Sequence, residues 1–435
     1  MRCFGRFGGF ALWLSASSMA AITMPGLAQQ DSAPDSAASS TEAPTPTNSG
    51  ERPVANGRDE DFDALGLETG RIDLTLDART EFSDNFYYDP DNERSVVGAV
   101  IRPSFNYSRS ATSAKLAAYG GVTGAVYSFN DEDNFVDYNL GGSADIELAQ
   151  VQNLSLSANF RHGHDPFGTD RTEGTARADA PLDEWNDTSA GVSYRTIAKA
   201  GVGVVFNLGA RVQDREYTTN EANTQFLNYT RRIGEVGMGW RFSPKTVTNI
   251  LYQRIRSDID KIAPGQRDRS GDTDTLVMGV TWVASTKTRG TAAIGGARRS
   301  TDARASSDFS SAYWSAGIDW EPSLRTSFEL STVRTYIESY RLNADFVDAT
   351  GTSLSWVQNW NSRVNTRLTT SFRRLDFVGT TDDDDYFRLA GRINIRIGEG
   401  SSIYLGANHT QRESTRSNLE FERSRGYLGL KTVLN

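Results

Sequence analysis

The sequence predicts an all-β protein, a transmembrane antiparallel β-barrel of about 18 strands, with 16 as the alternative count. Two observations lead to this fold class. Short segments of alternating apolar and polar residues recur from residue 71 onward, and the loops between them are alternately short and long. The mean hydropathy is nevertheless −0.50. A barrel wall needs apolar residues at only every second position, so it reaches a low hydropathy without a long apolar run.

Residues 314–330 show the pattern most clearly. Apolar side chains occupy every second position from Trp314 to Trp320, and the residues between them are small or polar. Glu321 to Ser323 interrupt this run, and alternation resumes at Leu324. Two alternating segments separated by so short a break predict a β-hairpin with a tight turn.

Four tryptophans stand at or near the ends of such segments, just before short turns. They are Trp240, Trp282, Trp320 and Trp360, spaced 38 to 42 residues apart. That interval fits one strand pair with its loops. Because indole prefers the boundary between hydrocarbon and headgroups, we predict that these four residues form a membrane-interface girdle. The alternative is a set of tryptophans in the core of a soluble β-sandwich.

The beginning of the chain has the features of a secretory signal over residues 1–28. Arg2 and Arg6 provide a positive start, residues 7–21 an apolar centre, and residues 26–28 a small-residue exit. The single cysteine, Cys3, lies inside this signal. We therefore expect a mature chain without a thiol, which excludes disulfides, cysteine metal sites and thiol catalysis.

Residues 29–70 are rich in Ser, Ala, Pro and Thr and are predicted to form a disordered, acidic periplasmic segment. Nine acids stand against Arg52 and Arg58, a net charge of −7. Most of the negative charge of the chain lies here, so the barrel itself is nearly neutral and nothing favours nucleic acid as a partner. We expect a spacer, with contact between residues 59–63 and a periplasmic protein as the alternative.

Residues 71–435 are expected to form the barrel. The alternating segments lie near residues 71–87, 95–108, 113–128, 134–149, 153–164, 184–196, 200–214, 227–242, 245–258, 271–283, 287–300, 309–320, 324–338, 350–360, 363–376, 384–397, 401–412 and 419–434. Tight turns on one side and longer polar loops on the other place both ends of the barrel on the short-turn side and require an even strand count. Pro103 falls inside a segment, and a closed barrel has no free edge, so we expect a local bulge there.

Several of these motifs, in this order, resemble those of the putative β-barrel porin 2 family of Gram-negative outer-membrane proteins. They are the hairpin WEPSLRTSFEL (320–330), the turn SPKT (243–246) after a Trp-bearing strand, and an opening strand that ends TEFSDNFYYD (80–89). The resemblance covers most of residues 71–435. It implies an outer-membrane barrel that passes exopolysaccharide, because family members are often encoded beside exopolysaccharide genes. The chain end, GLKTVLN, departs from the terminal aromatic that the barrel assembly machinery usually recognises.

Strand parity predicts which side chains line the pore. On the segment 363–376 the outward positions are the even-numbered ones, and on 384–397 they are the odd-numbered ones. Six arginines then face inward as pore-lining candidates: Arg363, Arg367, Arg373, Arg388, Arg392 and Arg396. We expect this stripe to guide an anionic solute or an acidic polysaccharide. The alternative is structural neutralisation by lumen acids, which are Asp73, Asp77, Asp145, Glu147, Asp319 and Glu329.

No catalytic site, metal site or cofactor is predicted. His162 and His164 share one strand face, but only Asp165 lies beside them, and we expect residues at a loop edge rather than metal ligands. The expected partners are outer-membrane lipid and lipopolysaccharide, the assembly machinery, and periplasmic polysaccharide-export proteins. We therefore expect a non-enzymatic, integral outer-membrane channel for exopolysaccharide. The alternatives are a general diffusion porin for ions and small solutes, and a closed-lumen structural or adhesion barrel.

Overall fold

The computed structural model describes residues 70–168, 172, 181–196, 202–262, 264, 268–302, 308–339, 341, 344 and 346–434. The predicted signal, residues 1–28, and the predicted acidic segment, residues 29–70, lie outside this part apart from Gly70. In the part of the chain that is described, no helix is long and apolar enough to cross a membrane.

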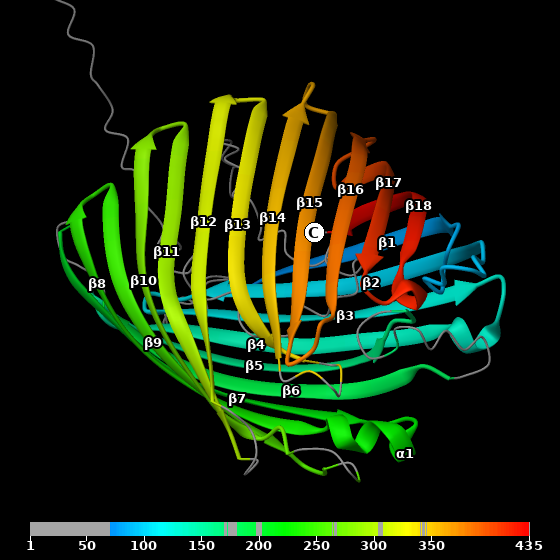
Figure 1. Cartoon of the computed structure of the whole chain (residues 1–435). Helices are drawn as coiled ribbons and strands as arrows, with labels where there is room; N and C mark the ends of the chain where they lie inside the picture. The colour runs from blue at the N-terminus through cyan, green and yellow to red at the C-terminus, as the bar shows by residue number, and fades with distance from the viewer. Residues whose placement is uncertain are drawn as a thin grey trace, which may run out of the picture.

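Eighteen strands make up the described fold, and each of β1 to β17 pairs with the strand that follows it in the chain (Figure 1). Their bounds are β1 (Arg71–Ser83), β2 (Val96–Ser110), β3 (Ala114–Tyr127), β4 (Phe135–Ala149), β5 (Gln152–Asp165), β6 (Asp183–Thr196), β7 (Gly203–Tyr217), β8 (Tyr229–Ser243), β9 (Thr246–Ile259), β10 (Gly271–Ser285), β11 (Thr288–Thr301), β12 (Phe309–Ser323), β13 (Thr326–Glu338), β14 (Phe346–Asn359), β15 (Val364–Val378), β16 (Asp383–Arg396), β17 (Ser401–Ser414) and β18 (Phe421–Leu434). Short helices lie between strands: α1 (Glu221–Thr224), η4 (Asp131–Asp133), η7 (Gln225–Leu227) and η8 (Ser417–Leu419).

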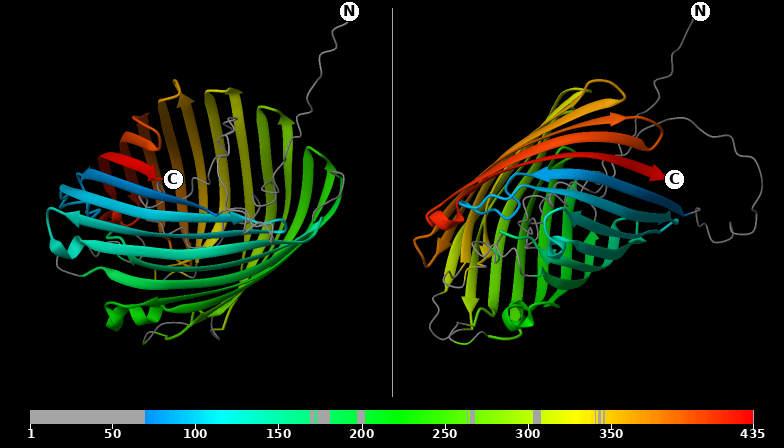
Figure 2. Two further views of the ribbon diagram at one scale, coloured as in Figure 1. Left: turned by 180° about the vertical axis from the view of Figure 1, so that it is seen from behind. Right: turned by 90° about the vertical axis from the view of Figure 1, so that its right-hand side faces the viewer.

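The sheet closes on itself. β1 pairs antiparallel with β2 on one side and with β18 on the other, where Leu74 lies opposite Leu434. The strands therefore form a closed barrel, with β2–β6 and β12–β15 on opposite sides of it (Figure 2). Closure satisfies the backbone hydrogen bonds of every strand, which a wall in contact with lipid requires. The predicted fold class and the count of 18 are confirmed.

Two strand ends differ most from the prediction, the end of β1 and the start of β14. β1 ends at Ser83 rather than near residue 87, because Asn85 begins a turn. The Nδ2 atom of Asn85 donates to the carbonyl of Asp89 (2.9 Å), and its Oδ1 accepts from the Asp89 N–H (3.0 Å). β14 begins at Phe346 rather than near residue 350, and Val347 at its start packs in a buried cluster with Phe377.

The bulge expected at Pro103 is absent, so this prediction was wrong. Pro103 lies opposite Leu76 of β1 in an unbroken register. On the other side, the pairing of β2 with β3 skips Arg102 and Pro103 and resumes at Ser104 without a register shift. The missing N–H interrupts the ladder on one side only, and no residue is inserted.

Outward side chains are apolar because every second residue faces away from the lumen. On β16, for example, Phe387, Leu389 and Ile393 are 41%, 42% and 42% exposed on the outer face. On the inner face, some tyrosines lie flat on the wall. A Cβ atom at Gly429 would come within 2.3 Å of the ring of Tyr404, and one at Gly406 within 2.3 Å of the ring of Tyr427. These glycines leave room for rings that would otherwise project into the lumen.

Loop residues pack together at the long-loop end of the barrel. Tyr87 is buried against Phe129 and Phe167, which come from two other loops. Its hydroxyl donates to Oδ2 of Asp133 at 2.6 Å. Burial raises the pKa of the Asp133 carboxyl above its usual value, and the hydrogen bond from Tyr87 acts in the opposite direction without cancelling it.

Candidate functional site on the lumen wall

The predicted arginine stripe lies on two neighbouring strands. Arg367 of β15 is the direct register partner of Arg392 of β16. Below them, the Arg396 N–H donates to the carbonyl of Arg363 at 2.7 Å, so these two residues are also adjacent. Outward residues on the same strands, such as Leu368 and Ile393, are 42% exposed on the opposite face. Alternation therefore directs the six arginines into the barrel, while their role in a pore remains a prediction.

Five of the six arginines make no salt bridge with any residue that the structure describes: Arg363, Arg367, Arg373, Arg392 and Arg396. Instead, the guanidinium of Arg392 lies 3.9 Å from the ring centroid of Tyr404, and its Nε donates to Oδ1 of Asn394 at 2.7 Å. Like charges that face each other across a sheet are destabilising unless water or an anion offsets them. The positive charge of these five arginines is therefore not offset by an acidic side chain among the described residues.

The lumen acids predicted to neutralise the stripe have other neighbours. Asp73 pairs with Arg71 at 2.8 Å, and Asp77 accepts from the Tyr404 hydroxyl at 2.5 Å. Asp145 accepts from Ser155 at 2.5 Å. Asp319 lies opposite Glu329 on β13 and opposite Arg289 on β11, so the basic residue beside it belongs to β11 and not to the stripe.

Four further basic residues extend the stripe and were missed from the sequence. Arg412 of β17 lies opposite Tyr386 of β16, and on β18 the side chains of Arg423, Arg425 and Lys431 share the inward parity. The signal was present, because the apolar residues Leu428, Leu430 and Leu434 define the outward face of β18. We call the whole set the basic wall: Arg363, Arg367, Arg373, Arg388, Arg392, Arg396, Arg412, Arg423, Arg425 and Lys431.

One acid faces inward on the described residues of β15–β18. Asp384 is fully buried and accepts from Arg412 (2.7 Å), from Ser414 (2.6 Å) and from Arg341 (2.6 Å), which comes from the connection between β13 and β14. This cluster joins that connection to the top of the basic wall. Asp384 is thereby committed to arginines at the rim and does not neutralise the stripe below.

The neighbouring part of the lumen, from β9 to β14, has a different lining, and we call it the neutral wall. Above the irregular short-turn end of β12, its inward charges among the described residues are Arg289, Arg299, Asp319 and Glu329, which balance. The other inward residues of these strands are uncharged. Among them Leu251, Val277, Ala293 and Tyr313 form a buried cluster on adjacent strands.

The four predicted girdle tryptophans have outward parity and lie near the short turns. Trp240, Trp320 and Trp360 are 49%, 47% and 54% exposed, and Trp282 lies against Gly290 of the next strand. Trp320 stacks on Phe328 with ring centroids 5.3 Å apart. The placement suits a membrane interface, and that role remains a prediction.

The two strand histidines have partners of their own. Nδ1 of His162 lies 2.9 Å from Oδ1 of Asn186, and Nδ1 of His164 lies 2.8 Å from Oδ1 of Asp137. Across the described residues, no group of three or more His, Cys, Asp or Glu side chains is arranged to hold a metal ion.

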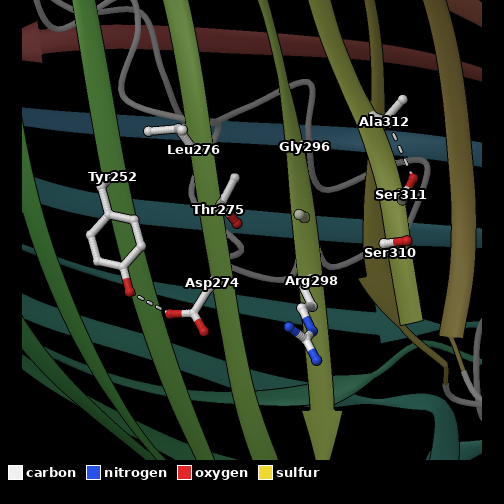
Figure 3. Close-up of a pocket in the computed structure, with 10 residues that line it drawn as sticks. Tyr252, Asp274, Thr275, Leu276, Gly296, Arg298, Ser310, Ser311 and Ala312 are labelled. Atoms are coloured by element: carbon white, nitrogen blue, oxygen red, sulfur yellow. Dashed lines mark hydrogen bonds between the residues drawn. The ribbon is translucent and has the colours of Figure 1, made fainter. Parts of the chain in front are cut away.

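A hollow of about 410 Å³ opens on β9–β12 (Figure 3). It is lined by Leu276, Gly296, Arg298 and the hydrogen-bonded pair Tyr252–Asp274 (2.5 Å). Leu276 is 52% exposed on this face, which is the outer one. The hollow therefore lies outside the lumen and is not part of a pore.

The closed wall, the outward apolar band and the charged interior together define an outer-membrane β-barrel of porin type. The chain belongs to the putative beta-barrel porin 2 family, whose sequence model matches residues 60–433. The predicted family is thereby confirmed. In such barrels the long loops are extracellular and the short turns periplasmic, and we expect the same orientation here.

Solved structures with a similar chain course are outer-membrane proteins. Pseudomonas aeruginosa OpdK with vanillate is 9% identical, with a TM-score of 0.48 over 83% of this chain and 99% of that one. Acinetobacter baumannii OccAB2 is 10% identical, with a TM-score of 0.49 over 86% and 99%. The siderophore receptor PirA from Pseudomonas aeruginosa is 10% identical, with a TM-score of 0.46 over 84% and 81%. No curated protein matches the sequence.

Proposed function

We propose that the protein is a passive, non-enzymatic channel that passes an anionic exopolysaccharide across the outer membrane along the basic wall. One observation carries the proposal. Five inward arginines have no acid partner among the described residues, and they run down two adjacent strands. A polyanion supplies the missing negative charge at several points at once.

The spacing of the arginines suits a polymer more than a small ion. On β16, Arg388, Arg392 and Arg396 recur at every fourth residue, which corresponds to roughly 13 Å along the strand. A chain with regularly repeated carboxylates engages one arginine as it leaves another. Conduction requires binding at several weak sites rather than at one strong site, and a ladder of this kind meets that requirement.

The surroundings that the proposal calls for are those of an export channel. We propose contact with outer-membrane lipid and lipopolysaccharide, insertion by the barrel assembly machinery, a periplasmic N-terminal segment, and delivery of the polymer by periplasmic export proteins. A general diffusion porin would work without such delivery proteins, and a closed-lumen structural barrel would conduct no ions. Both alternatives are separable by experiment.

The electrostatic part is tested by single-channel recording in planar bilayers with a KCl gradient. The double variant Arg367→Glu with Arg392→Glu should change the channel from anion-selective to cation-selective, because it reverses the charge of two facing residues. Arg374→Glu is the matched control, since Arg374 lies on the same strand with its side chain on the outer face, paired with Asp376 at 3.0 Å. Unchanged selectivity in the double variant would remove the basic wall as the determinant.

The cargo is tested in cells. A strain that lacks the protein should lose surface polysaccharide, and the wild-type barrel should restore it. The Arg367→Glu, Arg392→Glu variant should insert normally, conduct ions and fail to restore the polysaccharide. Normal polysaccharide in the deletion strain, together with an open conductance in vitro, would make the protein a general diffusion porin.

A further inference from the structure

A third part of the lumen, on β3–β5, carries an exposed aromatic ring. Tyr119 of β3 has inward parity, because Leu116 and Val122 mark the outer face of this strand with 45% and 43% exposure. Tyr119 itself is 39% exposed, whereas the inward tyrosines Tyr404 and Tyr313 are 2% and 4% exposed. The ring of Tyr119 is therefore open to the lumen.

The ring of Tyr119 lies along the wall and crosses β4. Its direct partner on β4 is Gly141, where a Cβ atom would come within 2.4 Å of Cζ of the ring. The Tyr119 hydroxyl donates to Oδ1 of Asn159 on β5 at 3.3 Å. The glycine thus leaves room for the ring against the strand, and the hydrogen bond holds its far end.

Two asparagine side chains flank this ring on the same face. Asn139 of β4 is the register partner of Gly121, and a Cβ atom at Gly121 would lie 3.4 Å from Oδ1 of Asn139. Asn159 is the register partner of Gly141 on the other side of β4. The Nδ2 groups of both asparagines donate to no residue that the structure describes. We call Tyr119, Asn139 and Asn159 the tyrosine patch.

The surroundings of the tyrosine patch are polar and open. Ser157 and Ser189 border it on β5 and β6. Arg161, the register partner of Asn139, is directed to another ring, with its guanidinium 5.0 Å from the ring centroid of Trp185. β2–β6 lie across the barrel from β12–β15 (Figure 2), so the patch is opposite β15, the first strand of the basic wall.

This combination of groups suits a sugar ring. A pyranose has C–H groups on its faces and hydroxyl groups around its edge. The face of an aromatic ring carries partial negative charge and attracts C–H groups, while a carboxamide both donates to hydroxyls and accepts from them. Diagonal neighbours across a strand pair are roughly 7–8 Å apart, so Tyr119 and Asn139 can contact one sugar together. A carboxylate gains nothing from the face of the tyrosine, which repels negative charge.

We propose that the tyrosine patch is a sugar-binding subsite, on which the sugar rings of the passing polymer stack. The inference rests on the proposed function, because it assigns a second contact to the same cargo. The basic wall recognises the charge of the polymer, and the tyrosine patch recognises that it is a carbohydrate. The channel thereby distinguishes an acidic polysaccharide from another polyanion of equal charge.

Stacking is tested with uncharged probes in planar bilayers at 1 M KCl, where the Debye length is about 3 Å and the basic wall is screened. A linear glucose hexasaccharide at millimolar concentration should produce brief blockades, seen as excess current noise. A poly(ethylene glycol) of equal hydrodynamic size should produce several-fold less. Tyr119→Ala should remove this difference. Equal noise from the two probes in the wild-type channel, or an undiminished difference in Tyr119→Ala, would overturn the proposal.

The matched control is Tyr138→Ala. Tyr138 lies on the neighbouring strand β4 and is 43% exposed, but on the outer face. Its removal should leave the difference between the two probes unchanged. An equal loss in Tyr138→Ala would show that the effect does not come from the lumen.

Two further variants separate the ring from its hydroxyl and from its position. Tyr119→Phe keeps the ring and should retain most of the hexasaccharide noise. Gly141→Val fills the space beside the ring and should reduce the noise although Tyr119 is still present. A loss in Tyr119→Phe as large as that in Tyr119→Ala would assign the effect to the hydroxyl and reject stacking.

Two acidic probes of equal charge separate this inference from the proposed function. They are an oligosaccharide with a carboxylate on every sugar and an oligomer of glutamate. Equal blockade by both, unchanged in Tyr119→Ala, rejects the tyrosine patch and leaves the basic wall intact. Stronger blockade by the saccharide, reduced to that of the peptide in Tyr119→Ala, supports the patch. No blockade by either acidic probe, with hexasaccharide noise that still depends on Tyr119, rejects the basic wall and retains the subsite.

Discussion

The basic wall and the neutral wall are adjacent parts of one sheet and share one outward pattern. Ile393 on β16 and Leu276 on β10 are 42% and 52% exposed to the outside. On the inside, Arg367 faces Arg392 in one wall, whereas Ser331 faces Ser353 in the other. Contact with lipid requires apolar residues at every second position of both walls, whereas the inward residues between these positions can differ. The two walls therefore differ in the charge of their inward side chains and not in their outward face.

The largest effect on stability is expected from substitution of Asp384, the inward acid on β15–β18 among the described residues. Asp384→Ala leaves Arg412 and Arg341 buried without their carboxylate, which typically destabilises by about 3–5 kcal/mol. On the neutral wall, Asp319→Ala removes an exposed acid and should change stability by less than about 0.5 kcal/mol. Urea unfolding of the two variants in lipid vesicles, followed by tryptophan fluorescence, gives the comparison. Equal midpoints would show that the Asp384 cluster does not stabilise the rim.

The next effect concerns selectivity. Ser331→Glu with Ser353→Glu places two facing carboxylates on the neutral wall, as Arg367→Glu with Arg392→Glu does on the basic wall. The serine variant should reduce anion preference without reversing it, because all the arginines remain. Reversal potentials in a KCl gradient measure both variants. Equal reversal would mean that total lumen charge matters and its location does not.

A smaller change is expected from the tyrosine that lies on the basic wall. Gly429→Val puts a side chain where the ring of Tyr404 lies, since a Cβ there would be 2.3 Å from it. The ring should turn into the lumen and lower single-channel conductance. Gly398→Ala, at a glycine with open space around it, is the control. Normal conductance in Gly429→Val would show that the constriction lies elsewhere.

The smallest effect is a pH dependence in the extracellular loops, away from both walls. Burial raises the pKa of Asp133, so the folded state binds its proton more tightly than the unfolded chain does. Its contribution to loop stability is present below the unfolded pKa and is lost as pH rises through the raised folded pKa. Protease protection of residues 128–134 should therefore increase as the pH falls. Asp133→Asn should abolish this dependence, and an unchanged slope would exclude Asp133 as its source.

The alternation of side chains along a strand explains why the sequence could assign the arginines to the inner face. Side chains alternate with a period of two, so Phe387 and Leu389 on one face assign Arg388 to the other without knowledge of register. The same reasoning applied to Leu428 and Leu430 would have found Arg425 and Lys431. The strand count followed in the same way from repeated alternation.

Contacts that depend on tertiary structure could not be predicted from the sequence. The Asp384 cluster joins a strand to Arg341, 43 residues earlier in the chain, and no local pattern predicts such a pair. The fit of Tyr404 over Gly429 requires the register between β17 and β18. At Pro103 the sequence indicated that a backbone hydrogen bond between strands would be missing. Only the observed pairing of β2 with β3 shows that the strands accommodate the proline without a bulge.

The most direct test of the account is single-channel blockade by two oligosaccharides of equal length, one with a carboxylate on every sugar and one neutral. Both are added from the periplasmic side of the wild-type channel. We predict frequent, voltage-dependent blockade by the acidic oligomer and brief, rare events with the neutral one, and we expect this difference to be lost in Arg367→Glu, Arg392→Glu. Equal blockade by the two oligomers would contradict the claim that the basic wall recognises an anionic polymer.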